Sequence, residues 1–595
     1  MKITKNIARL AVTAGLTAAL SFGGVMAPVT MAFAAEGATT EANSITITQN
    51  ANNKDAIDPN KKTQFIAYQI FNAKVDDENG SGRKVVSDVT WAIEDVQIQN
   101  QIIDAIKKSI ENDPSESQLP TKPTAQNVAE WMAANLQSAS GVVNDGDLLD
   151  KIADLLKGAT PTKPKGATSA AFAADGPVSF ENSGYYLFLT DNGSIGGKDN
   201  YSERMQTGTS PIFAVVGGSA VVVTEKTGIP TVTKKIKDDK PGSHWADKAD
   251  SQVGQNVQYQ LTGTVAENVA SFNTYYYEFY DELSAGLIAD KDSVHVTVYA
   301  NNEDTSGTEV NLPAGAVEYN TTGNNNVLTV KFNDLKAVTA KTGSSAISIT
   351  KDSRVVVTYL AKLNPAKIEK VTVGGRGNDN EVKLIYSNNP MSEGKGESVP
   401  DTVRDYTYAL QLVKEDFDDN NKKLKDVEFT IKATGADELA SGTVGTQFVQ
   451  ENGSLGGTEH KFKTNENGEI SVTGLDAGTY TVHEVENSNP GYNTLPDFTF
   501  TITAEGLDKL EGETLAGNAA PNTLKVTAEQ NDSTLVTPSV NDGTVTLTIQ
   551  NKKGSNLPLT GLNGVTFTWI AGGAVLCIGV AHLIRSRKRG DGSEE

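Results

Sequence analysis

Short runs in which apolar and polar residues alternate recur through most of this chain of 595 residues. Alternation with a period of two is typical of strands that bury one face, and turn-forming residues separate the runs. The pattern is nearly all β from 224 to 399, and it repeats from 400 to 553. The runs lie at 257–261, 294–299, 327–332, 355–360, 382–386, 408–414, 427–431, 479–484, 498–502 and 545–551. Many short strands of this kind predict tandem immunoglobulin-like β-sandwiches, and therefore a mainly β fold class.

The region from 36 to 223 has a mixed pattern. Strand-like runs open and close it, and helical periodicity occupies its middle. Strands are predicted at 44–48, 63–73, 183–190 and 212–223, and helices at 98–110, 125–136 and 148–156. We therefore expect an α+β N-terminal domain in front of two β-sandwich domains.

The first residues follow the pattern of an export signal. Lys2, Lys5 and Arg9 precede a stretch rich in Ala, Leu, Val and Gly, and Ala32-Phe33-Ala34 supplies small residues at the spacing a signal peptidase needs. Residues 1–35 are therefore predicted to be a signal peptide, and the protein to be secreted.

The last residues, 554–595, carry three features in order. The first is Leu557-Pro558-Leu559-Thr560-Gly561. The second is Val565–Ile584, 20 residues without a charge, which is long enough to cross a bilayer as a helix. The third is a basic tail that favours the cytoplasmic side, comprising Arg585, Arg587, Lys588 and Arg589.

This arrangement resembles the LPxTG sorting signal of sortase substrates in Gram-positive bacteria. The resemblance implies that a sortase cuts between Thr560 and Gly561 and transfers the Thr560 carbonyl to an amine. It also implies anchoring to peptidoglycan, so that the chain spans the membrane only as a precursor. We therefore expect a surface protein of the cell wall.

Composition excludes several functions. The net charge of −22 argues against a nucleic-acid partner, which would need clustered Lys and Arg. The only cysteine, Cys577, lies in the predicted span, so no disulfide can staple the exported part. No HExxH, P-loop or Gly-x-Ser-x-Gly motif is present, and we predict neither a cofactor nor a metal. Asp416, Asp418 and Asn420 imitate the start of a calcium loop, but the Gly and Glu that such a loop requires are missing.

The third region carries a set of polar residues at the ends of apolar strand faces. By parity, Lys414 shares a face with Leu410 and Leu412, while Glu484 and Asn551 end apolar faces of two other strands. If these faces form the core, burial favours a neutral amine and a neutral carboxylic acid. Lys414 could then attack the Asn551 amide with help from Glu484, forming an isopeptide bond and releasing ammonia. The alternative is a buried salt bridge without a covalent bond.

The sequences LVKED, GTYTVHEVENSNPGY and VTLTIQNKK resemble the CnaB-type domain of Gram-positive pilins. In that family a first-strand Lys, a Glu and a last-strand Asn form an autocatalytic isopeptide bond. The matching residues are Lys414, Glu484 and Asn551.

The second region repeats this logic with an Asp as the acid. PTVTKKIKDD, YYYEFYDELSAGL and VKLIYSNNP resemble the middle domain of SpaA-type shaft pilins, which implies a bond between Lys234 and Asn388 assisted by Asp281. Lys235 and Asn389 are adjacent alternatives. Parity favours Lys234 and Asn388, although a β-bulge would reverse it.

A polymer also needs an acceptor amine. In shaft pilins this lysine lies in a YPK-type motif between the first two domains, and the corresponding residue here is Lys226. The tyrosine and proline of that motif are replaced by Thr224 and Glu225. Lys226 could therefore also be an ordinary solvated linker lysine. If Thr560 is joined to Lys226, tension passes only through the second and third domains.

The resemblance identifies the chain as a sortase-assembled major pilin. This implies a covalent homopolymer of identical subunits, made by sortase, attached to peptidoglycan and supporting adhesion. Ancillary pilins and a host surface are further possible partners. The chain would then be a sortase substrate and no enzyme. The alternative is a monomeric wall-anchored adhesin, or an ancillary pilin of the tip or base.

Overall fold

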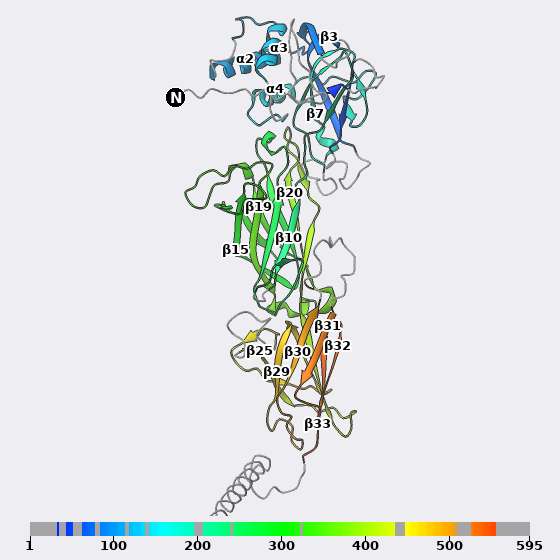
Figure 1. Ribbon diagram of the computed structural model, residues 1–595, viewed down its shortest axis with the longest axis vertical. Helices are drawn as coiled ribbons and strands as arrows, with labels where there is room; N and C mark the ends of the chain where they lie inside the picture. Colours follow the sequence, from blue (N-terminus) through cyan, green and yellow to red (C-terminus); the bar gives the residue numbers. More distant parts are fainter. Residues whose placement is uncertain are drawn as a thin grey trace, which may run out of the picture.

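The computed structural model describes residues 33–34, 43–50, 62–77, 84–112, 118–136, 142–195, 206–238, 242–321, 325–434, 447–505, 507 and 525–554. These residues form three domains that follow one another along one long axis (Figure 1). Most of the predicted signal peptide, the sorting motif and the predicted span at 565–584 lie outside them. Within the described ranges, no helix is long and apolar enough to cross a membrane.

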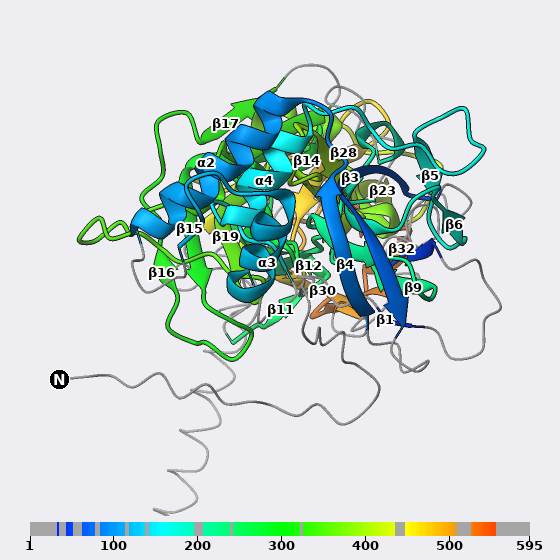
Figure 2. The same cartoon turned by 90° about the horizontal axis from the view of Figure 1, so that it is seen from above.

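The first domain has three layers. Its central sheet has the order β4-β3-β7-β8, with β5 paired to β3, and a second sheet has the order β1-β9-β2-β6. The strands are β1 (Phe33–Ala34), β2 (Ser44–Thr48), β3 (Gln64–Asp77), β4 (Lys84–Trp91), β5 (Ala171–Ala173), β6 (Val178–Ser179), β7 (Gly184–Thr190), β8 (Ile212–Val216) and β9 (Val221–Thr224). The helices α2 (Val96–Asn112), α3 (Ala125–Asn135) and α4 (Leu148–Leu156) form the third layer, as the view from above shows (Figure 2).

Strand β7 explains this layering. All of its residues are buried, because the strand is covered on both faces. Tyr185 and Leu187 pack among the helices, whereas Tyr186 and Phe188 pack against the second sheet. A strand buried on both sides must be apolar throughout, which is why its sequence does not alternate.

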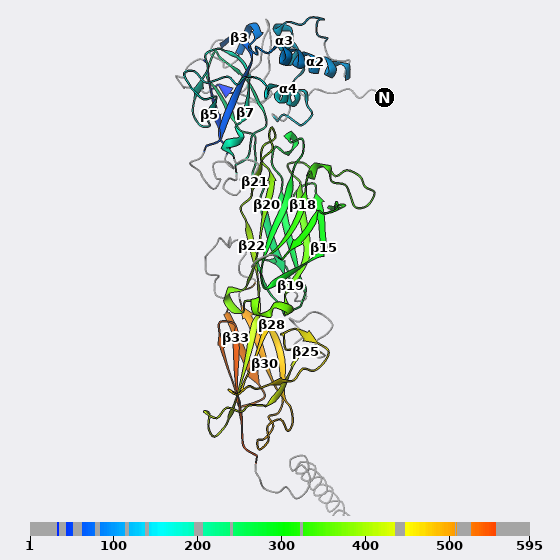
Figure 3. The same ribbon diagram turned by 180° about the vertical axis from the view of Figure 1, so that it is seen from behind.

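The second domain is a sandwich of two sheets. One has the order β11-β10-β13-β19-β15-β16, and the other has the order β12-β22-β20-β14-β18-β17, with β21 paired to β20 (Figure 3). The strands are β10 (Val232–Lys237), β11 (Trp245–Ala246), β12 (Lys248–Asp250), β13 (Val257–Thr264), β14 (Tyr277–Ser284), β15 (Leu287–Tyr299), β16 (Thr308–Glu309), β17 (Val317–Asn320), β18 (Asn325–Phe332), β19 (Arg354–Leu363), β20 (Asn378–Ser387), β21 (Lys395–Glu397) and β22 (Asp401–Tyr406).

The third domain is a second sandwich. Its sheets have the orders β28-β23-β33-β32 and β26-β25-β24-β29-β30-β31, with β27 paired to β24. The strands are β23 (Tyr408–Asp416), β24 (Glu428–Ala433), β25 (Gln447–Val449), β26 (Leu455–Gly456), β27 (Phe462–Lys463), β28 (Glu469–Leu475), β29 (Gly478–Glu484), β30 (Phe498–Glu505), β31 (Lys525–Asn531), β32 (Val536–Asn541) and β33 (Thr544–Asn551). The first strand, β23, and the last strand, β33, lie side by side and run parallel.

The second and third domains meet in a close joint. Only Thr407 separates β22 from β23. Gly374 of the second domain has φ +80°, and a Cβ there would lie 2.0 Å from the carbonyl oxygen of Asp542 in the third. This approach requires a glycine, since a side chain would clash with backbone.

The mainly β fold class is confirmed, and so is the mixed N-terminal domain. One boundary differs from the expectation. Residues 401–406 form β22, which pairs with β20 and β12 of the second domain. The third domain therefore begins after Thr407 and not at 400.

Candidate crosslinking sites

Three polar residues meet in the core of the third domain. Lys414 lies on β23, Glu484 ends β29 in the opposite sheet, and Asn551 ends β33. Each of the three is at most 2% exposed. Their strands alternate regularly here, so the same parity that buries Leu410 and Leu412 turns Lys414 inward.

The Glu484 carboxyl joins the other two side chains. Its Oε2 accepts a hydrogen bond from Lys414 Nζ at 3.0 Å, and its Oε1 accepts one from Asn551 Nδ2 at 2.7 Å. Lys414 Nζ also donates to Asn551 Oδ1, so the amine lies against the carbonyl group that it would attack. The backbone N–H of Leu495 donates to Glu484 Oε2 at 3.1 Å and helps to fix the carboxyl.

The surroundings favour the nucleophilic form of the amine. Burial lowers the pKa of Lys414 to about 8, against the opposing effect of the Glu484 charge. The ring of Phe429 lies 5.3 Å from Nζ and forms part of the apolar wall. An uncharged amine beside an amide and a carboxyl group that can accept and return a proton is the arrangement needed for aminolysis of that amide.

The second domain holds a related cluster. Lys234 Nζ donates to Asp281 Oδ1 and lies 3.3 Å from the hydroxyl of Tyr359. Lys234 and Asp281 are both fully buried, and burial lowers the pKa of Lys234 to about 8 and raises the pKa of Asp281. The adjacent Lys235 points outward and pairs with Asp247 at 2.6 Å. Lys234 is thus the inward-facing lysine.

The structure does not bring Asn388 to this cluster. Asn388 Nδ2 donates to the carbonyl oxygen of Ile195 in the first domain at 3.1 Å, so it lies at the junction of the first and second domains. Asn389 lies there too, with Nδ2 3.4 Å from Asn192 Oδ1.

Asn380, which the sequence reasoning missed, occupies the corresponding place. It is fully buried, and its Nδ2 donates to the Tyr359 hydroxyl at 2.8 Å. In the register of β14 with β20, Asp281 is opposite Val382 and Leu283 is opposite Asn380. The amide thus lies one inward-facing position away from the acid. The only feature of the sequence that points to Asn380 is its strand parity, which it shares with Asn388.

Lys226 follows β9 between the first two domains, and its side chain is exposed. Its backbone is fixed on both sides, because its N–H donates to Thr209 Oγ1 at 2.8 Å and its carbonyl oxygen accepts from the Ser210 N–H at 3.1 Å. The preceding Glu225 is buried and accepts from the Asn50 N–H at 3.0 Å. Lys226 thus presents an amine to solvent from an ordered backbone.

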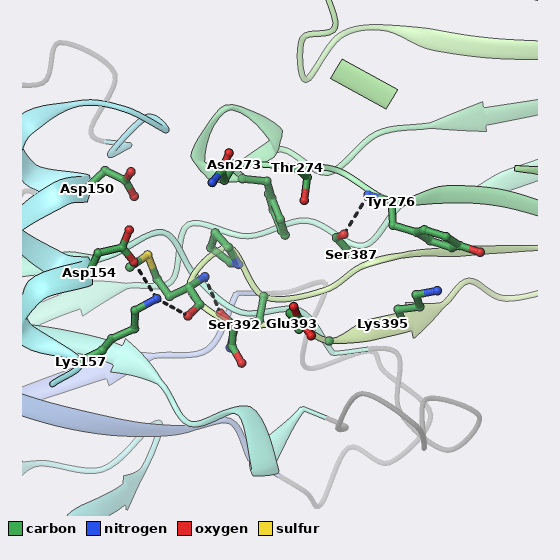
Figure 4. Close-up of a pocket in the computed structure, with 15 residues that line it drawn as sticks. Asp150, Asp154, Lys157, Asn273, Thr274, Tyr276, Ser387, Ser392, Glu393 and Lys395 are labelled. Atoms are coloured by element: carbon green, nitrogen blue, oxygen red, sulfur yellow. Dashed lines mark hydrogen bonds and ion pairs between the residues drawn. The ribbon is translucent and has the colours of Figure 1, made fainter. Parts of the chain in front are cut away.

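A cleft of about 510 Å³ lies at the same junction. Figure 4 shows Asp150, Asp154 and Lys157 of α4 on one side and residues of the second domain on the other. Lys157 crosses the junction, since its Nζ donates to the carbonyl oxygen of Met391 at 3.0 Å and pairs with Asp154 at 2.6 Å. Lys157 is therefore a second lysine at this junction, but it is tied to both domains.

Several solved structures are similar to this chain. The T6 backbone pilin of serotype M6 Streptococcus pyogenes is 17% identical, with 87% of this chain and 100% of that chain covered and a TM-score of 0.44. The major pilin SpaD of Corynebacterium diphtheriae is 15% identical, with 87% and 98% covered and a TM-score of 0.39. BcpA, the major pilin subunit of Bacillus cereus, is 18% identical, with 67% of this chain and 91% of that chain covered and a TM-score of 0.32. No curated protein sequence matches the chain.

The family comparison is more specific, although it covers a smaller part of the chain. The SpaA family, described as a prealbumin-like fold domain, matches residues 409–514. This range begins within β23 and includes Lys414 and Glu484. The third domain is therefore a SpaA-type prealbumin-like domain.

Proposed function

We propose that this chain is the shaft subunit of a covalently polymerised pilus on the surface of a Gram-positive bacterium. A sortase joins Thr560 of one subunit to Lys226 of the next, and the last subunit is attached to peptidoglycan. The observation that carries the proposal is the buried set of Lys414, Glu484 and Asn551 in a SpaA-type domain. The protein is a substrate of sortase, and its own carboxyl groups act once, during maturation.

Two intramolecular isopeptide bonds form part of the proposal. In the third domain Lys414 Nζ attacks Cγ of Asn551, the Cγ–Nδ2 bond breaks and ammonia leaves. In the second domain Lys234 reacts in the same way with Asn380, which replaces Asn388 as the proposed partner. Glu484 and Asp281 carry the protons.

The position of the third-domain bond suits a subunit under tension. Strands β23 and β33 are parallel neighbours, with Ala409 opposite Thr544 and Asp416 opposite Asn551. Force that enters at the start of β23 and leaves at the end of β33 would otherwise shear their hydrogen bonds. A bond from Lys414 to Asn551 joins the two strands near their C-terminal ends. The residues between Lys414 and Asn551 in the chain then lie outside the covalent path that carries the force.

Substitution of the acceptor lysine tests the polymer. In the strain that makes this protein, Lys226→Ala should abolish high-mass ladders in cell-wall extracts while the monomer persists. Lys157→Ala is the matched control, because it removes another lysine of the same junction and should leave the ladders intact. Ladders that persist in Lys226→Ala would refute the assignment of Lys226, and their loss in Lys157→Ala would point to Lys157 instead. Ladders absent from wild-type extracts would favour a monomeric anchored adhesin.

A further inference from the structure

The two sites differ in how the acid reaches the amide, and the difference assigns a role to a tyrosine. We propose that the Tyr359 hydroxyl relays a proton from the Asp281 carboxyl to the departing amide nitrogen of Asn380 when the second-domain bond forms. This inference rests on the proposed function, because it concerns one step of the same reaction.

The Tyr359 hydroxyl lies between all three reacting groups. It donates to Asp281 Oδ2 at 2.5 Å, accepts from Asn380 Nδ2 at 2.8 Å and lies 3.3 Å from Lys234 Nζ. One hydroxyl can donate once and accept twice, so these three contacts use its full capacity. No other partner is needed to explain its orientation.

The third domain shows why a relay is required in the second. Glu484 spans its site alone, with one oxygen on the Lys414 amine and the other on the Asn551 amide. Aspartate is one methylene shorter. Asp281 places Oδ1 on the Lys234 amine, but its Oδ2 meets the Tyr359 hydroxyl, and this hydroxyl in turn meets the Asn380 amide.

The tyrosine is held rigidly in dry surroundings. Tyr359 is 2% exposed, and its ring stacks on Tyr259 with centroids 5.3 Å apart and planes 12° from parallel. Burial raises the pKa of Tyr359 well above its ordinary value, so the phenol keeps its proton between transfers. Water that could carry the proton instead is kept from a site whose members are nearly all fully buried.

The proton transfers balance without another reactant. The neutral Lys234 amine forms a bond to Cγ of Asn380 and passes one proton to Asp281 Oδ1. The Asp281 carboxyl then turns so that its protonated oxygen faces Tyr359. Once the amide has become tetrahedral, Nδ2 has a lone pair, so it accepts the proton of Tyr359 while the Tyr359 oxygen takes the proton of Asp281. The Cγ–Nδ2 bond then breaks and ammonia leaves. Asp281 and Tyr359 end in the protonation states in which they began.

Removing the hydroxyl tests the relay. The ectodomain is made by cell-free synthesis, samples are stopped over time, and intact mass with peptide mapping follows the loss of ammonia from each domain. Tyr359→Phe should slow the second-domain bond by at least about tenfold, since a positioned proton donor typically contributes about 10²–10⁴ in rate. The third-domain bond in the same molecules should form at the wild-type rate, which shows that the chain has folded.

Tyr277→Phe is the matched control. Tyr277 is also fully buried on β14, but its hydroxyl donates to the carbonyl oxygen of Thr264 at 2.7 Å, away from the cluster. Its second-domain bond should form at nearly the wild-type rate. Equal slowing in Tyr277→Phe and Tyr359→Phe would mean that any lost core hydroxyl has this effect, and would overturn the relay.

A longer acid provides the rescue. Glutamate at 281 should reach Asn380 directly, as Glu484 reaches Asn551. Asp281→Glu combined with Tyr359→Phe should therefore crosslink faster than Tyr359→Phe alone. If Asp281→Glu alone forms the bond but the double variant is no faster than Tyr359→Phe, the relay is refuted. A wild-type protein without a Lys234–Asn380 crosslink would refute the proposed bond itself, whereas normal crosslinking in Tyr359→Phe would refute only the relay.

Discussion

Asn551 Nδ2 donates a hydrogen bond of 2.7 Å to Glu484 Oε1, and this contact crosses the core from the last strand of the third domain to the opposite sheet. It places the leaving group of the proposed reaction on a group that can carry a proton. The contact therefore makes Glu484 the residue whose substitution tests the third-domain bond most directly.

We expect Glu484→Gln to keep the shape of the site and to stop the reaction. Its purified ectodomain should be heavier than the wild type by one ammonia, apart from the mass of the substitution. It should also be less stable by about 5 kcal/mol, the loop-closure effect expected of a crosslink over so long a loop, here with a sequence separation of 137. Intact mass and denaturant unfolding provide the two readouts.

Glu486→Gln is the control for this experiment, because Glu486 lies two residues further along and is exposed. It should retain the crosslink and the wild-type stability. A Glu484→Gln protein that still lacks the ammonia would show that the carboxyl is not required.

The identity of the second-domain amide gives a separate prediction. Asn380→Ala should leave Lys234 unlinked and restore one ammonia to the mass, because Asn380 is the amide that meets Tyr359 in the cluster. Asn388→Ala should leave the bond intact, because Asn388 contacts Ile195 at the first-domain junction. Peptide mapping of both variants decides between them, and a Lys234–Asn388 peptide in the wild type would contradict the structural assignment.

These two amides also show what the sequence could and could not predict. Strand parity correctly indicated that Lys414, Glu484 and Asn551 face inward, because facing depends only on local alternation in regular strands. The choice between Asn380 and Asn388 depends on how β20 is registered against Asp281 on β14, 100 or so positions earlier in the chain. Register is a long-range property, and both asparagines have the same parity.

The predicted start of the third domain, at 400, was wrong for a similar reason. The alternating pattern predicts a third domain that starts at 400, which would include residues 401–406. The structure pairs them with β20 and, in parallel, with β12. Parallel pairing between segments so distant in sequence leaves no local pattern, whereas the helices α3 and α4 were predicted within one residue because their periodicity is local.

The rate of third-domain bond formation should depend on pH in a defined way. The Lys414 amine attacks the Asn551 amide only in its neutral form. Burial lowers the pKa of Lys414 to about 8, so the amine becomes neutral as the pH rises through about 8. The rate should therefore rise with pH up to about 8 and level off above it.

To measure this profile, the protein is made by cell-free synthesis at a fixed pH and then transferred to buffers between about pH 6 and 10, which bracket the pKa of Lys414. Ammonia loss is followed by intact mass in Asp281→Ala, so that only the third-domain bond contributes. A rate that does not rise as the pH approaches about 8 would show that deprotonation of Lys414 does not limit the reaction.

The joint between the second and third domains supports the last prediction. Gln252 of the second domain is 1% exposed and reaches into the third. Its Nε2 donates to the carbonyl oxygen of Gly453, while its Oε1 accepts from the Asp476 N–H at 3.0 Å and from the Tyr480 hydroxyl at 3.1 Å. Removing this amide deprives its buried partners of these hydrogen bonds, at a cost of about 1–3 kcal/mol for each group left unsatisfied.

Gln252→Ala should therefore loosen the joint while both sandwiches stay folded, because each keeps its own hydrophobic core. Spin labels at Asp292→Cys and Glu466→Cys, both exposed positions, report the distance between the domains. The Gln252→Ala protein should give a broader distance distribution than the wild type, and Gln258→Ala, an exposed glutamine on β13, should not. Since a filament transmits force stiffly only if its joints resist bending, an unchanged distribution in Gln252→Ala would mean that Thr407 and the glycine contact at Gly374 hold the domains without this side chain.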